Sequence, residues 1–124
     1  MSGLLLDTNI LVDYLRNIEA ASQYLESLRV KPAASVVSVM ELIVGAKNRR
    51  EEERITTINE VVQLLPVTLD IARRAGEFFK HYAPSHATGD LDALIAATAE
   101  HHGLKLATLN TKHFPMFPKL KRAY

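Results

Sequence analysis

The chain has 124 residues, a formal net charge of +1, 48% hydrophobic residues and 23% charged residues, values that are ordinary for one globular domain over residues 1–124. It contains no cysteine, which excludes disulfide bonds and thiolate metal sites. No apolar run approaches the roughly 18 residues of a membrane span, and the N-terminal run is too short for a signal peptide, so we expect the protein in the cytoplasm.

The first half of the chain alternates between apolar runs of strand length and patterns of helical spacing. Residues 4–6 form a consecutive apolar run, which is typical of a strand covered on both faces. A short helix is predicted over residues 10–16, and a second helix extends to about residue 29. β-branched residues indicate a second strand over 33–37, and a helix over 38–47 follows it.

The second half repeats this alternation, and Pro66 indicates that its first strand lies at a sheet edge. The predicted elements are a strand over 64–68, a helix over 71–82, a helix over 91–102 and a strand over 104–109. Residues 119–124 are either a short fifth strand or an extended tail. Strands that alternate with helices predict an α/β fold with three α/β/α layers and a four- to five-stranded parallel sheet.

Polar side chains follow the predicted strands, at the sheet edge where parallel α/β folds bind ligands. Asp7 directly follows the first strand, Glu41 lies in the first turn after the second, and Asn110 directly follows the last. Asp92 begins the alanine-rich helix, on the side that faces the core. Carboxylates gathered at a partly buried site repel each other, and a divalent cation relieves that repulsion. Oxygen ligands favour Mg²⁺, with Mn²⁺ as the alternative, and such an ion can activate water at a phosphate.

Each acid also has a structural explanation. Ser38 and Glu41 fit a capping box, Asp90 and Asp92 lie in a first helical turn, and Asp7 is suited to cap the next helix. If capping explains all of them, the chain is a non-catalytic module that binds RNA through its basic C-terminal region. A phosphoryl-transfer fold of the receiver or phosphatase type is disfavoured, because no tandem acidic pair ends the first strand.

Four segments, in order, resemble the successive motifs of PIN-domain nucleases, and in particular the VapC-type toxins of toxin–antitoxin pairs. The segments are LLDTNIL (5–11), SVMEL (38–42), DALIAATA (92–99) and TLNTKHF (108–114). The resemblance runs from Leu4 to Phe114 and so covers most of the chain. It implies a PIN-like α/β/α fold and a Mg²⁺-dependent endoribonuclease that cleaves RNA with a metal-activated water.

The resemblance implies that Asp7, Glu41 and Asp92 are the catalytic acids and metal ligands. Asn110 takes the fourth position, which is acidic in many members of the family, and is a further candidate metal ligand. Asp90 is also a candidate metal ligand, because it is placed to compensate for the missing charge. VapC-type proteins usually dimerise and are inhibited by a cognate VapB-like antitoxin. Their substrates are often transfer RNAs.

Other residues are expected to support the acids. Neighbouring hydroxyl groups are candidates to orient the carboxylates, namely those of Thr8, Ser38 and Thr108. Basic side chains near the motifs are candidate RNA contacts, namely Arg16, Lys47 and Lys112. His113 lies in the last motif, and we expect it chiefly to pack its own loop.

Overall fold

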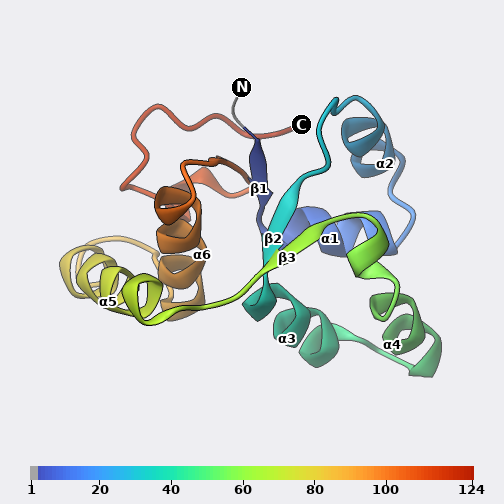
Figure 1. The fold of residues 1–124 in the computed structure, drawn as a ribbon, viewed down its shortest axis with the longest axis horizontal. Coiled ribbons are helices and arrows are strands. Elements are labelled where there is room, and N and C mark those ends of the chain that lie inside the picture. Colours follow the sequence, from blue (N-terminus) through green and yellow to red (C-terminus); the bar gives the residue numbers. More distant parts are fainter. Residues whose placement is uncertain (1–2) are drawn as a thin grey trace.

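The computed structural model describes residues 3–124 and arranges them as an open sheet with helices on both faces (Figure 1). The strands are β1 (Leu4–Leu6), β2 (Ala33–Ser35), β3 (Gln63–Leu65) and β4 (Lys105–Ala107). The helices are α1 (Thr8–Leu15), α2 (Glu19–Glu26), α3 (Val36–Gly45), α4 (Arg49–Ile55), α5 (Leu69–Tyr82) and α6 (Asp90–His101). Two 3-10 turns, η1 (Ile58–Glu60) and η2 (Thr111–His113), precede β3 and follow β4. Within residues 3–124, no helix has both the length and the apolar character needed to cross a membrane.

The sheet is parallel throughout, as predicted, with the strand order β3-β2-β1-β4. β1 is central, because Leu5 pairs with Ala33 of β2 on one side and with Leu106 of β4 on the other. The chain builds the sheet outward from β1 to β3 and then returns to add β4 on the opposite side. The carboxyl ends of β1 and β4 therefore form the topological switch point, where ligands bind in folds of this class.

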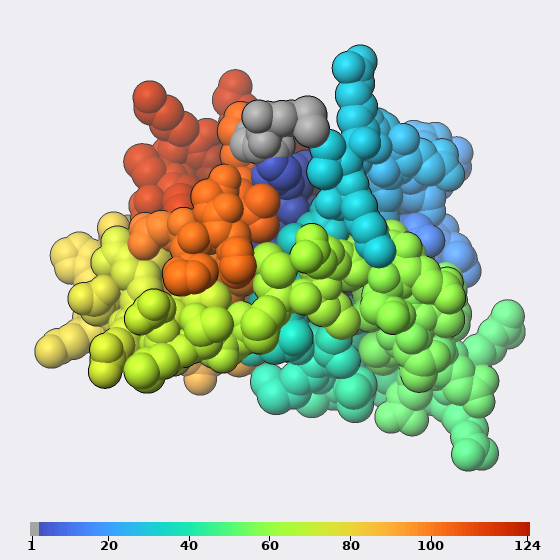
Figure 2. Space-filling view, in the orientation of Figure 1, coloured from blue at the N-terminus to red at the C-terminus, as the bar shows by residue number. Residues whose placement is uncertain are grey.

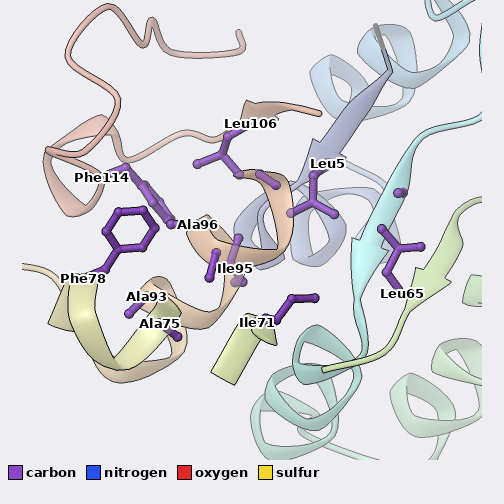
Figure 3. Packing of buried hydrophobic residues seen from close by; sticks show 13 residues of the cluster. Leu5, Leu65, Ile71, Ala75, Phe78, Ala93, Ile95, Ala96, Leu106 and Phe114 are labelled. Atoms are coloured by element: carbon purple, nitrogen blue, oxygen red, sulfur yellow. The ribbon is translucent and has the colours of Figure 1, made fainter. Parts of the chain in front are cut away.

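Successive residues of the strands face two separate cores, because side chains alternate across a sheet. Leu5 and Leu106 lie in the core that α5 and α6 cover, which Figure 3 shows at close range. Leu6 and Ala107 lie in the core that α1, α3 and α4 cover. Both faces of the sheet are buried, which explains the consecutive leucines of β1 and confirms the three-layer α/β/α architecture.

The second strand is shorter than predicted. β2 ends at Ser35 instead of Val37, and the valines at 36 and 37 begin α3. The hydroxyl of Ser35 accepts a hydrogen bond from the backbone N–H of Val37 at 3.2 Å and so caps the helix. This cap outweighs the β propensity of the two valines on which the prediction depended.

The third strand and the C-terminal segment also differ in detail from the prediction. β3 ends at Leu65, and Pro66 lies just beyond it at the edge of the sheet, the position that the proline indicated. Residues 119–124 contain no strand, so the extended-tail alternative holds. The tail is anchored by a hydrogen bond from Ala123 N to Thr108 O at 2.9 Å. Figure 2 shows the C-terminal region in red beside the orange surface of α6.

Candidate active site

Asp7 lies at the switch point, held from both sides. Its backbone N donates to Ala107 O at 2.8 Å, so the pairing of β1 with β4 continues to this residue. Its Oδ1 accepts from the backbone N of Thr8 at 2.8 Å, and its Oδ2 accepts from Thr108 Oγ1 at 2.7 Å. Asp7 caps α1, as its structural explanation required, yet it is only 6% exposed. An aspartate that only capped α1 would do so equally well at the protein surface.

Two other acids act on the Asp7 carboxyl group. Burial raises the pKa of Asp7 above its ordinary value, and the charges of Asp92 and Glu41 raise this pKa further. The hydrogen bonds from Thr108 and Thr8 lower the pKa without cancelling the rise. The structure therefore brings an acid after β1, an acid within α3 and an acid in the first turn of α6 within electrostatic reach of one another.

The capping-box explanation for Ser38 and Glu41 is wrong, because α3 begins at Val36 and both residues lie inside the helix. Thr8 Oγ1 donates to Glu41 Oε1 at 2.6 Å, since a carboxylate can only accept. The single hydrogen of Thr8 is thereby used, so the buried Ser38 hydroxyl donates to Thr8 Oγ1 at 2.8 Å. A chain of hydroxyl groups thus orients Glu41, which is the supporting geometry that we expected for Thr8 and Ser38.

Asp92 is a helix cap and is also one of the acids whose charge acts on Asp7. Its Oδ2 accepts from the backbone N of Gly89 at 2.8 Å, so it does cap α6. A Cβ at Gly89 would lie 3.2 Å from this oxygen, so the absence of a side chain lets the carboxylate approach. The same oxygen also lies 3.2 Å from His113 Nδ1. Asp92 is half-buried at the start of α6, and its charge acts on Asp7.

The two further candidates, Asp90 and Asn110, form hydrogen bonds with residues other than the three acids; the backbone N of Asn110 donates at 3.0 Å to Thr108 Oγ1, the hydroxyl that binds Asp7. Asp90 is exposed, and its Oδ1 accepts from the adjacent backbone N of Leu91 at 2.8 Å. Asn110 directs its side-chain amide to His113, with 3.0 Å between Nδ2 and Nε2. His113 therefore contacts two residues of the motifs, a role for which its sequence position is the only indication. Nothing in the sequence marked Thr88, whose buried hydroxyl donates to His113 O at 3.0 Å.

The three basic residues that are candidate RNA contacts differ in their neighbours. Lys112 is exposed in η2, two residues after Asn110. Arg16 lines a pocket together with Glu41 and lies 4.0 Å from Glu51. Lys47 is exposed, and its backbone N donates to the same Glu51 side chain at 3.4 Å.

The donor set around Asp7 suits a hard divalent cation, since the three acids supply only oxygen atoms and repel one another without a counter-charge. Within residues 3–124, Glu41 Oε2 and Asp92 Oδ1 accept no hydrogen bond, so each retains its lone pairs. In the same part of the chain, no three acidic or histidine side chains already lie close enough to ligate one ion. Binding would therefore require the carboxylates to draw together.

Comparison with known proteins identifies the family. Residues 4–120 match the family model of the PIN domain. The chain is 43% identical to ribonuclease VapC10 of Mycobacterium tuberculosis over 121 residues, which covers 95% of this chain and 90% of that protein. Ribonuclease VapC19 of the same organism is 40% identical, with 97% of this chain and 98% of that protein covered. The chain belongs to the PIN-domain family.

This PIN domain also superimposes on solved structures. One chain of a toxin–antitoxin complex from Klebsiella pneumoniae is similar with a TM-score of 0.83 and 34% sequence identity, covering 98% of both chains. VapBC2 from Rickettsia felis, bound to a promoter DNA fragment, has a TM-score of 0.79 at 23% identity and shares the fold. The predicted PIN-like α/β/α fold is therefore confirmed.

Proposed function

We propose that this PIN domain is the ribonuclease toxin of a VapBC-type toxin–antitoxin pair, and that it hydrolyses RNA phosphodiester bonds at the site of Asp7, Glu41 and Asp92. The convergence of two further acids, Glu41 and Asp92, on the buried carboxyl group of Asp7 carries this proposal. The 43% identity to a ribonuclease across nearly the whole chain supports the same activity. Capping alone does not explain the arrangement, because Glu41 lies inside α3 and caps nothing.

The three acids are the proposed metal ligands, and neighbouring hydroxyl groups orient two of them. Asp7, Glu41 and Asp92 would hold a divalent cation, Mg²⁺ or Mn²⁺, which when bound supplies a positive charge for the phosphate and activates water. The Thr108 hydroxyl holds Asp7, and the Ser38–Thr8 pair holds Glu41, so two acids keep fixed orientations. Pre-oriented ligands need less reorganisation when the ion and the substrate arrive.

Transfer RNA is the substrate class that we propose to test first. The chain is 30% identical, over 120 residues, to a protein of Shigella flexneri named tRNA(fMet)-specific endonuclease VapC, and the match covers 92% of this chain. The purified protein should cleave a transfer RNA with Mg²⁺ or Mn²⁺ and lose this activity with EDTA, while a DNA hairpin of equal length remains intact. Transfer RNA that is bound but never cut would instead support the non-catalytic RNA-binding module.

The proposed location of this activity is the cytoplasm.

Lys112 is the basic residue that we place on the RNA path, because it is exposed in η2, the turn that follows β4 and contains His113. Lys112→Glu should weaken RNA binding and reduce the slope of log affinity against log salt by about one unit, since one phosphate contact is lost. Filter binding at several salt concentrations, with EDTA to prevent cleavage, measures both quantities. An unchanged affinity and an unchanged slope would remove Lys112 from the interface.

Two features of the protein surface support a homodimer and an antitoxin complex as proposed assemblies. An apolar stripe along α3 is exposed, with Val44 81% accessible, which supports a homodimer through this helix; the stripe consists of Val36, Met40, Ile43 and Val44. The pocket that contains Glu41 and Arg16 has apolar walls, which supports an antitoxin segment bound beside the acids. Light scattering of the free protein tests the dimer, and co-purification with a VapB-like protein tests the antitoxin.

A further inference from the structure

Asn110, the residue at the fourth motif position, is linked to Asp92 through the His113 side chain. Asn110 Nδ2 lies 3.0 Å from His113 Nε2, and His113 Nδ1 lies 3.2 Å from Asp92 Oδ2. Thr88 Oγ1 donates to the backbone O of His113 at 3.0 Å and fixes this loop against the segment before α6. The path connects the end of β4 to the first turn of α6.

The partners determine where the imidazole carries its hydrogen. Nδ1 lies 3.2 Å from a carboxylate oxygen of Asp92, and this negatively charged neighbour favours the tautomer with hydrogen on Nδ1. Nε2 faces an amide nitrogen, which can only donate, so Nε2 accepts from Asn110. A neutral imidazole with hydrogen on Nδ1 is compatible with both contacts.

We propose that His113 and Asn110 are positioning residues for Asp92, and that Asn110 acts through His113 instead of contacting the metal. Asp92 Oδ2 accepts from the backbone N of Gly89 and lies 3.2 Å from His113 Nδ1, so two neighbouring groups restrict the position of the carboxylate. Oδ1 is then the oxygen available to a cation. An amide suits this role better than an acid, because a carboxylate at position 110 could not donate to Nε2. The inference rests on the proposed function only in taking Asp92 as a metal ligand.

The hydrogen-bond path is tested without metal by the tautomer of His113. Long-range ¹H–¹⁵N NMR of the imidazole nitrogens at pH 8, with EDTA, should show hydrogen on Nδ1 in the wild type. Asn110→Ala should shift the Nε2 resonance and reduce the population of this tautomer. The exposed His102, at the opposite end of α6, serves as the internal reference. A wild-type His113 with hydrogen mainly on Nε2 would overturn the proposal.

The positioning role is tested by Mn²⁺ affinity, measured by electron paramagnetic resonance. His113→Ala and Asn110→Ala should each lower the affinity about tenfold, the lower range for lost partners of metal ligands. The double variant should be no weaker than His113→Ala, because both changes break one path. His113→Asn keeps a donor near the place of Nδ1 and should restore part of the affinity, whereas His102→Ala should leave it unchanged.

The two hypotheses fail in different ways. If Asn110→Ala lowers Mn²⁺ affinity by the same factor with and without His113, Asn110 contacts the ion directly and the positioning proposal is wrong. If the wild type binds no Mn²⁺, the proposed metal-dependent function fails, and the NMR result still decides whether the path from Asn110 to Asp92 exists.

Discussion

Asp7→Asn should reduce RNA cleavage by at least about 100-fold, because the loss of a ligand should exceed the 10- to 100-fold effects of losing the partners of ligands. The substitution removes the negative charge on which Glu41 and Asp92 converge. It retains the shape of the side chain and an oxygen that can accept from the backbone N of Thr8, so α1 keeps its cap. Initial cleavage rates on one transfer RNA, at saturating Mg²⁺, measure the loss.

Asp70→Asn is the matched control for this experiment. Asp70 is an exposed acid in the first turn of α5, and its substitution changes the same charge without reaching the site. Circular dichroism of both variants should match the wild type. Cleavage that survives Asp7→Asn while EDTA still abolishes it would place the metal elsewhere and reject the proposed site.

Asp7→Asn should also stabilise the metal-free protein. The pKa of Asp7 is raised in the folded state, so the folded protein binds this proton more tightly than the unfolded chain. The contribution of Asp7 to the free energy of unfolding is fully favourable below its ordinary pKa of 3.8 and declines as pH rises through the folded pKa. At neutral pH the buried charge therefore destabilises the fold, and an uncharged asparagine removes that penalty.

We expect Asp7→Asn to melt several degrees above the wild type at pH 7 in EDTA, since about 1 kcal/mol corresponds to about 4 °C for a domain of this size. The difference should shrink as pH falls toward 4. Added Mg²⁺ should raise the melting temperature of the wild type more than that of the variant. A clearly lower melting temperature for Asp7→Asn at neutral pH would show that its carboxylate is chiefly a structural cap of α1.

The sequence predicts the sheet and its acidic edge well, because the signals are local. An apolar run that ends at an acid identifies β1 and Asp7, and the same reasoning places Asn110 after β4. The start of α3 is not predicted, since the valines at 36 and 37 suit a strand and only the Ser35 cap decides between the two. The sequence therefore identifies Glu41 by its position in a motif. The hydroxyl groups of Thr8 and Ser38 that orient it are seen only in the structure.

The contacts of Asp92 depend on segments that sequence patterns do not bring together. Its spacing in α6 predicts that it faces inward and that Asp90, two residues away on the helix, points elsewhere. The exposed side chain of Asp90 agrees with this expectation. The approach of His113 depends on the conformation of η2 and on the Thr88 hydroxyl, which no periodicity reports. Local sequence patterns do not predict such contacts between loops.

The hydrogen bond from Thr108 to Asp7 joins residues that are 101 positions apart in the chain. β1 leaves the ribosome early, but its partner β4 emerges only after α6 has been made. Pairings of this kind close late in folding, because a long loop must be ordered first. A nascent chain that ends before β4 holds Asp7 without its strand partner and without the Thr108 hydroxyl. A PIN domain built in this way cannot bring Asp7 and Thr108 together on the ribosome until almost all of the domain has been translated.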